Sequence, residues 1–213
     1  MIITYEGVDF IKLQQGDLTV ALNPVSKQSK LSGSNFGADV AMISLNHPDM
    51  NGVDAVTRKE KAPFVINGPG EYEVAGFFIK GYQSQSVYGG TERINTIYAF
   101  EIDGIRIVYL GALSQKDLDP QVKEELGDID ILFVPIGGEG VLDAAEAYNL
   151  AVKREPHVII PIHFNQVGEK DALKKFIKEG GEEDLKPVEK LTIKKKDIET
   201  MKGDIVVLEA IHS

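Results

Sequence analysis

The chain has 213 residues, of which 43% are hydrophobic and 26% are charged, so it is long enough to form one large domain with a sizeable core. Its net charge of −10 argues against a nucleic-acid groove, because binding phosphates requires clustered Lys and Arg. Because the chain has no Cys, it has no disulfide, no thiolate zinc site and no cysteine nucleophile.

The N-terminal segment and the hydropathy of the chain bear on its localisation. The first six residues, MIITYE, lack the basic segment and the long apolar stretch of a signal peptide. No apolar run approaches the roughly 20 residues that span a membrane. We therefore expect a cytoplasmic protein whose partners include neither membranes nor nucleic acid.

The first half of the chain is rich in predicted strands. We expect strands over residues 8–13, 18–22, 38–44, 64–66, 74–79, 95–102 and 105–110. The first two flank Gln15-Gly16-Asp17 and predict a hairpin, and residues 67–71 are typical of a turn. The clearest hairpin has the two-residue turn Asp103-Gly104 between its strands.

The second half alternates predicted strands with predicted helices. We expect strands over residues 129–135, 157–163, 191–193 and 205–210, and helices over 120–126, 143–153 and 169–179. Pro120 suits the first position of a helix, and Asp143 suits an N-cap. No linker interrupts the chain, so residues 1–213 predict a single α/β domain of two sheets covered by helices.

Six short segments carry a family resemblance. They are Ser44-x-x-His47-Pro48-Asp49, Gly68-Pro69-Gly70-Glu71-Tyr72-Glu73, Asn95-Thr96-Ile97-Tyr98, Gly111-Ala112-Leu113, the run from Asp130 to Gly138, and Ile160-Pro161-Ile162-His163. In this order they resemble the metallo-β-lactamase superfamily, and within it the UlaG-like branch of metal-dependent hydrolases, whose namesake opens the lactone of a phosphorylated ascorbate. The resemblance implies an αββα sandwich of two mainly antiparallel or mixed sheets flanked by helices. It also implies a metal site at one edge, between the sheets.

The resemblance places the metal ligands of the family on seven positions, and some of these carry side chains that cannot bind a metal ion. These positions are Leu45, His47, Asp49, Met50, a position near Gln85, Ala112 and His163. Only three of them, His47, Asp49 and His163, carry a side chain of a metal-ligand type. No His occurs between residues 48 and 156, so the ligand near Gln85 is missing wherever the alignment falls.

These replacements predict that no dinuclear metal centre forms. A two-metal hydrolytic site shares a hydroxide between cations about 3.5–4 Å apart and needs a bridging carboxylate, for which this chain has Ala112. A catalytic zinc ion needs three protein ligands and an open position. Met50 is a soft thioether that suits zinc, manganese or magnesium poorly.

Two functional interpretations remain open at this point. In the favoured one, His47, Asp49 and His163 form a hydrogen-bonded polar cluster with Leu45 and Met50 packed around it, and the protein is a non-catalytic or small-molecule-binding relative. In the alternative, the same three side chains hold one Zn or Mn ion, and Asp49 is the candidate catalytic residue of a hydrolase. In either case we expect His47 and His163 within about 12 Å of each other at one sheet edge. The resemblance further implies a homo-oligomer, since relatives in this branch are often oligomeric.

Overall fold

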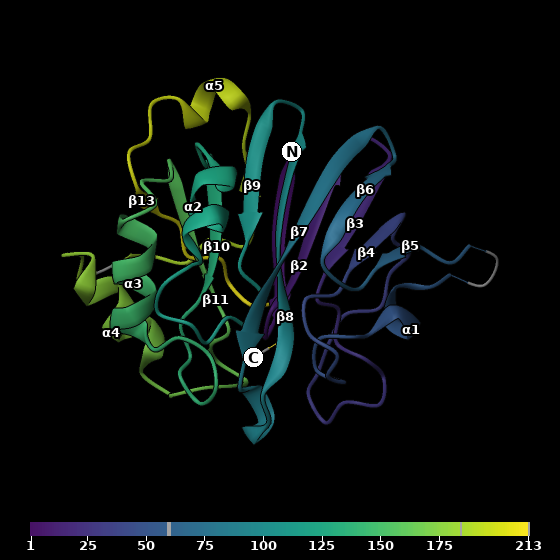
Figure 1. Ribbon diagram of the computed structural model, residues 1–213, viewed down its shortest axis with the longest axis horizontal. Coiled ribbons are helices and arrows are strands. Elements are labelled where there is room, and N and C mark those ends of the chain that lie inside the picture. Colours follow the sequence, from purple (N-terminus) through teal and green to yellow (C-terminus); the bar gives the residue numbers. More distant parts are fainter. Residues whose placement is uncertain (59–60, 184, 213) are drawn as a thin grey trace.

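The computed structural model describes residues 1–58, 61–183 and 185–212, and these form two sheets that face each other (Figure 1). The smaller sheet has the strand order β12 (Leu191–Thr192), β1 (Ile2–Gly7), β2 (Phe10–Gln15), β3 (Leu18–Leu22), β4 (Val40–Met42) and β5 (Phe64–Ile66). Its first four strands are antiparallel, and β3, β4 and β5 run parallel.

The larger sheet has seven strands and is also mixed. Their order is β13 (Asp204–Ile205), β11 (Val158–Ile162), β10 (Ile131–Pro135), β9 (Ile105–Tyr109), β8 (Arg93–Ile102), β7 (Phe77–Ser86) and β6 (Gly70–Val74). The strands from β6 to β9 form an antiparallel meander, whereas β9, β10, β11 and β13 are parallel. The predicted pair of mixed sheets is therefore confirmed.

Helices lie outside the sheets (Figure 1). They are α1 (Val53–Val56), α2 (Pro120–Leu126), α3 (Ala144–Val152), α4 (Ala172–Glu179) and α5 (Lys195–Ile198), with a 3₁₀ turn η1 (Tyr88–Gly90). The predicted start of α2 at Pro120 and the predicted N-cap of α3 at Asp143 are confirmed. Asp119 accepts from the backbone N–H of Gln121, and Asp143 forms a reciprocal capping box with Glu146.

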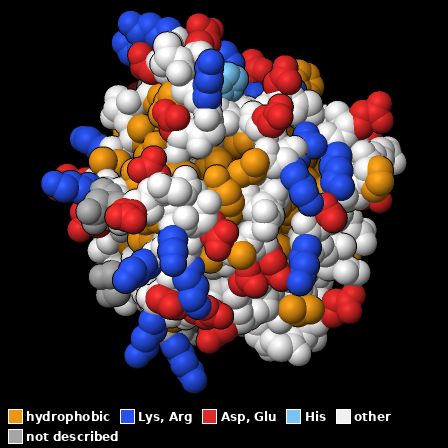
Figure 2. Space-filling view, turned by 90° about the vertical axis from the view of Figure 1, so that its left-hand side faces the viewer, with side chains coloured by type: hydrophobic (Ala, Val, Ile, Leu, Met, Phe, Trp, Pro, Cys, Tyr) orange, Lys and Arg blue, Asp and Glu red, His pale blue; other side chains and the backbone are white. Residues whose placement is uncertain are grey.

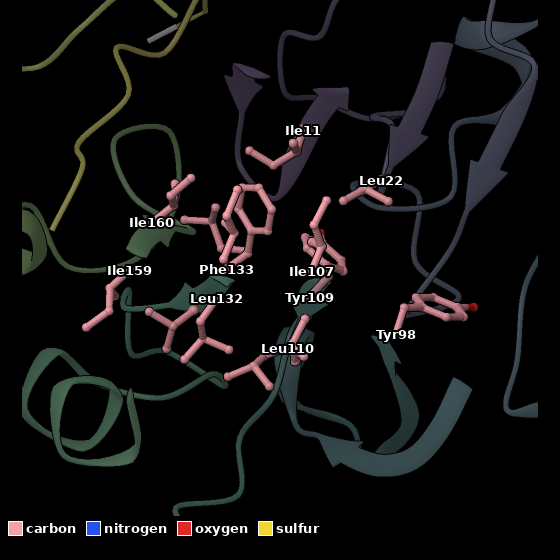
Figure 3. Close-up of a cluster of buried hydrophobic side chains, with 14 of the residues drawn as sticks. Ile11, Leu22, Tyr98, Ile107, Tyr109, Leu110, Leu132, Phe133, Ile159 and Ile160 are labelled. Atoms are coloured by element: carbon pink, nitrogen blue, oxygen red, sulfur yellow. The ribbon is translucent and has the colours of Figure 1, made fainter. Parts of the chain in front are cut away.

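The main core lies between the sheets (Figure 3). Ile11 and Leu22 from the smaller sheet face Tyr109 and Phe133 from the larger sheet, and all four are buried. Leu132, next to Phe133 on β10, points toward the helices, because successive strand side chains alternate between the two faces. This double burial explains why β10 and β11 are continuously apolar.

Three predictions of local structure were wrong. Residues 74–79 do not form one strand, because Ala75 and Gly76 make a tight turn with φ of 52° and 84° between β6 and β7. The segment 67–71, expected as a turn, already enters β6 at Gly70. Strand β1 was not predicted, and the last strand covers only Asp204–Ile205 instead of residues 205–210.

Charged side chains of both signs are distributed over the surface. On the side of α3 and α4, apolar side chains gather near the centre, and Lys, Arg, Asp and Glu are interspersed around them (Figure 2). Among the described residues, no helix is long and apolar enough to cross a membrane.

Candidate functional site

The loop that carries His47 and Asp49 leaves the smaller sheet at the end of β4. A buried amide fixes the start of this loop: Asn23 Nδ2 donates to Ser44 Oγ over 2.8 Å, and Asn23 Oδ1 accepts from the Ser44 N–H over 2.7 Å. Further along, the N–H groups of Met50 and Asn51 both donate to the His47 carbonyl, which closes a turn. His47 and Asp49 are therefore presented on a rigid turn at the sheet edge.

His163 reaches the same edge from the larger sheet, directly after β11. Its N–H donates to the Val8 carbonyl over 2.6 Å, and its φ of 62° turns the chain sharply. Its Nδ1 lies 2.7 Å from Asp9 Oδ2, and both side chains are fully buried. Asp9 follows an irregularity in the sheet, because the pairing register of β1 and β2 shifts between Tyr5 and Gly7.

Tyr88 lies between the two histidines. Its ring centroid is 5.0 Å from that of His47 and 5.1 Å from that of His163, with interplanar angles of 85° and 89°. Its hydroxyl donates to Asp49 Oδ2 over 2.8 Å. The predicted proximity of His47 and His163 is therefore confirmed, since both rings contact one tyrosine.

Asp49 is the acceptor that joins this cluster together. Besides Tyr88, the Ser29 hydroxyl donates to Asp49 Oδ1, and this bond holds the loop of residues 26–37 against the site. His47 Nδ1 lies 3.3 Å from Asp49 Oδ2. The same Nδ1 accepts from the backbone N–H of Asp49 over 3.3 Å, so Asp49 lies directly beside the His47 imidazole.

The predicted hydrogen-bonded cluster of His47, Asp49 and His163 was wrong for His163, because its partner is Asp9. Asp9 and Tyr88 were not predicted as members of the site. Both are distant in the chain from the residues that they contact there. The only sequence signal for Asp9 is a carboxylate between two apolar residues, Val8 and Phe10, at the start of a strand. Tyr88 precedes Gly89 and Gly90, which indicates a turn but says nothing about where the ring lies.

The positions of the replaced ligands form an apolar floor beneath Tyr88. Leu45, Met50, Ala112 and Val141 pack as one buried cluster, with the Tyr88 ring against it. The backbone N–H of Ala112 donates to the buried Asn95 Oδ1 over 3.0 Å. The predicted packing of Leu45 and Met50 around the polar cluster is confirmed.

Gln85 does not belong to the site. Its side chain is exposed, whereas its neighbours Ser84 and Ser86 on β7 are buried, since strand residues alternate between faces. Ser86 Oγ accepts from the Tyr88 N–H over 3.2 Å and is the strand residue that contacts the cluster. Gln85 therefore faces away from the cluster, and the nearest inward-facing positions of β7 are Ser84 and Ser86.

Burial and the neighbouring Asp49 carboxylate keep the Tyr88 hydroxyl protonated. Burial raises the pKa of Tyr88 above its ordinary value of 10.0, and the hydrogen bond to the Asp49 carboxylate raises it further. A neutral phenol that donates to a carboxylate is a stable arrangement at neutral pH. The Tyr88 hydroxyl consequently acts as a donor to Asp49 and not as a base.

The arrangement does not fit a metal ion. Within residues 1–58, 61–183 and 185–212, no group of three His, Asp or Glu side chains is placed to hold one. The ring of Tyr88 packs edge-to-face against both His47 and His163, and Asp49 is already bonded to two hydroxyls. His163 Nε2 is buried without a hydrogen-bond partner among the described residues, and the Tyr88 ring is its neighbour.

We expect Tyr88→Phe to destabilise the protein by about 1–3 kcal/mol at neutral pH, because the variant leaves Asp49 without a charge-assisted donor. Chemical denaturation of both proteins measures the difference. Tyr72→Phe is a suitable control, since its hydroxyl donates only to backbone carbonyls at the protein surface. A loss for Tyr88→Phe no larger than that of the control would show that the bond to Asp49 contributes little.

We also expect stability to fall steeply above about pH 10. Burial raises the pKa of Tyr5, Tyr88, Tyr98 and Tyr109 above 10.0, so these phenols ionise in the unfolded chain before they do so in the folded one. The stabilisation is full below the unfolded pKa and is lost as pH rises, by about 1.4 kcal/mol per pH unit for each group. Denaturation midpoints between pH 8 and 11 should therefore decline less steeply for Tyr88→Phe than for the natural chain. Parallel declines would contradict the raised pKa of Tyr88.

Comparison with known proteins assigns the chain to a superfamily. Residues 2–163 match the family described as the beta-lactamase superfamily domain. The chain belongs to this superfamily, and its two sheets and flanking helices are the metallo-β-lactamase fold.

Individual relatives agree with this assignment. A crystal structure from Thermotoga maritima, described as a candidate Zn-dependent hydrolase of the metallo-β-lactamase superfamily, has 30% identity and a TM-score of 0.77, and the match covers 98% of each chain. An isothiocyanate hydrolase from Delia radicum gut bacteria has 16% identity and a TM-score of 0.66, over 91% of this chain and 100% of the other, and shares the fold. A protein from Natranaerobius thermophilus named a metal-dependent hydrolase is 23% identical over 189 residues, which is 78% of this chain and 84% of the relative. The finer assignment to the UlaG-like branch stays a prediction.

Proposed function

We propose that this chain is a non-catalytic member of the metallo-β-lactamase superfamily that binds a small polar molecule at the mouth of its former metal cleft. One observation carries the proposal: the Tyr88 ring lies between His47 and His163, where its hydroxyl bonds to Asp49. Asp49 is thereby bonded to hydroxyls of the protein, and the Nδ1 of His163 is bonded to Asp9. The apolar floor of Leu45, Met50 and Ala112 offers no replacement ligands.

A cavity beside His47 supports the binding role. It has a volume of about 310 Å³, within the lower range for small-molecule sites. Its walls carry the Ser26 hydroxyl, the amides of Gln28, Asn46 and Asn51, the His47 imidazole and the Asp54 carboxylate. Such side chains suit a ligand with several hydrogen-bonding groups, such as a hydroxylated or amide-containing molecule, and not an apolar one.

A second candidate is a hydrolase with a single metal ion, and one observation favours it. His163 Nε2 is buried without a partner and is next to Tyr88, so a rearranged Tyr88 would expose a vacant imidazole nitrogen. The relatives' name, metal-dependent hydrolase, agrees with this candidate. The candidate requires Tyr88 to give up both its contact with the histidines and its bond to Asp49.

Turnover measurements separate the two candidates. We expect hydrolysis of lactone, thioester and phosphodiester substrates at background, with and without added Zn²⁺ or Mn²⁺, because the described residues offer no open ligand set around Tyr88. Tyr88→Ala serves as the comparison, since it removes the ring and leaves His47, Asp49 and His163 in place. Metal-dependent turnover by the natural chain would overturn the proposal in favour of the single-ion hydrolase.

A further inference from the structure

Strand β6 is an open edge of the larger sheet. It pairs with β7 on one side only, and no other strand of the described residues pairs with it (Figure 1). Val74 and Phe77 close the hairpin around the tight turn at Ala75 and Gly76. Because the bonding of antiparallel pairs alternates, the backbone N–H and C=O groups of Glu71 and Glu73 then point away from β7. Both residues are exposed, so these groups are available to a further strand.

The two faces of β6 differ in chemistry. The side chains of Glu71 and Glu73 share a face with Lys80 and Phe78, their partners on β7. Tyr72 and Val74 lie on the other face and are half-buried against the core. A strand added to this edge would therefore meet carboxylates on one side and apolar groups on the other.

A groove continues from the carboxylate face of β6 across the sheet. It has a volume of about 660 Å³, and Phe78, Lys80, Tyr82 and Glu101 are among its lining residues. Phe78 is 73% exposed, an unusual position for a large apolar ring. The sheet register places Glu73 on one side of Phe78 and Glu101 on the other.

Negative charge dominates this surface. Four carboxylates border it, those of Glu71, Glu73, Glu101 and Glu125, against the two cations Lys80 and Arg106. The Lys80 ammonium is already 2.5 Å from Glu125 and 3.3 Å from Glu71. Among the described side chains, no ion pair forms with Glu73 or Glu101, so a cation brought by a partner would find them available.

The charge pattern decides which occupant fits. Antiparallel pairing of two β6 strands about a twofold axis through Tyr72 would place Glu71 of each copy beside Glu73 of the other, and like charges at such positions are destabilising. The net charge of −10 on each chain adds to this repulsion. We infer that β6 accepts an extended basic segment of a partner protein as an additional strand, in which Lys or Arg alternates with apolar residues.

In this arrangement each part of the edge has a defined role. The backbone groups of Glu71 and Glu73 hold the segment, as in other cases of strand addition. Lys or Arg side chains of the segment lie beside the carboxylates of Glu71 and Glu73. They also reach Phe78, whose exposed ring suits a cation. The alternate apolar side chains contact Tyr72 and Val74. The inference is independent of whether the former metal cleft is catalytic.

A titration with a synthetic peptide tests the inference. The probe is an acetylated and amidated seven-residue peptide of alternating Lys and Val, added to the ¹⁵N-labelled full chain. We expect saturable chemical-shift changes confined to Gly70–Val74 and the residues next to Phe78 on β7. The double variant Glu71→Lys/Glu73→Lys should weaken binding at least tenfold, because each substitution replaces an attraction with a repulsion. Folding of each variant is checked from the dispersion of the same spectra.

Two controls separate strand addition from general attraction of cations. Glu179→Lys/Glu182→Lys makes the same change in net charge at exposed positions outside β6, and should leave binding within about twofold. The same peptide with alternate backbone nitrogens methylated keeps its charge but loses its edge donors, and should bind at least tenfold more weakly. Absence of saturable binding overturns the inference, as does equal binding by the methylated peptide or by the charge-reversed β6 variant.

Discussion

Four substitutions together, Leu45→His, Met50→His, Ala112→Asp and Tyr88→Ala, are expected to raise the zinc content of the purified chain toward two ions. The first three return nitrogen and carboxylate ligands to the positions that the family resemblance indicates, and in this chain those positions form the apolar floor. The fourth removes the ring that lies between His47 and His163. Elemental analysis after dialysis against a weak chelator gives the stoichiometry.

The matched control keeps Tyr88 and carries only the other three substitutions. If the tyrosine ring closes the site, this triple variant should hold less zinc than the quadruple one and should bind it more weakly. A zinc-dependent rise in the melting temperature provides a second readout, because an ion that binds only the folded state stabilises it. Equal zinc contents for the two variants would mean that Tyr88 does not obstruct the site. A metal-free quadruple variant would mean that the ligand positions have been assigned wrongly.

Asp9→Ala is expected to lower the free energy of unfolding by about 3–5 kcal/mol, the effect of breaking a buried pair. Asp9 and His163 are fully buried and 2.7 Å apart, so the variant leaves the imidazole without its partner in a dry environment. Urea denaturation near neutral pH measures the change.

The double variant Asp9→Leu/His163→Phe is the control for that pair. It removes both polar groups at once, and should be less destabilised than Asp9→Ala alone, since no orphaned polar group remains. If Asp9→Ala instead costs less than about 1 kcal/mol, the pair does not hold the two sheets together at this edge. Asp49→Ala, which affects a partly exposed carboxylate, should fall between these limits.

Much of the fold was predictable because its signals are local. The Asp103-Gly104 turn fixes the β8–β9 hairpin, and Pro120 and the N-cap Asp143 mark the starts of two helices. Continuous apolar runs identified β10 and β11 as strands buried on both faces. The turn at Ala75-Gly76 was missed because Ala rarely adopts a positive φ, and nothing in the residue type announces one there.

The site was predictable only in part, because its decisive contacts are distant in sequence. His47, Asp49 and His163 followed from the order of the segments, and the structure brings all three into contact with Tyr88 or its neighbours. The partners Asp9 and Tyr88 lie 154 residues from His163 and 39 residues from Asp49, respectively, and no spacing rule connects them. Gln85 was expected near the site but faces away from it, because a shift by one residue moves a side chain to the other face of the sheet.

We propose that Tyr88 and the apolar floor replace the metal centre of the superfamily. The most direct measurement is the elemental analysis of the natural chain, purified without a histidine tag and dialysed against metal-free buffer. We expect well below one zinc, manganese or iron ion per chain, unchanged by addition and removal of excess Zn²⁺. Two tightly held ions per chain would contradict it.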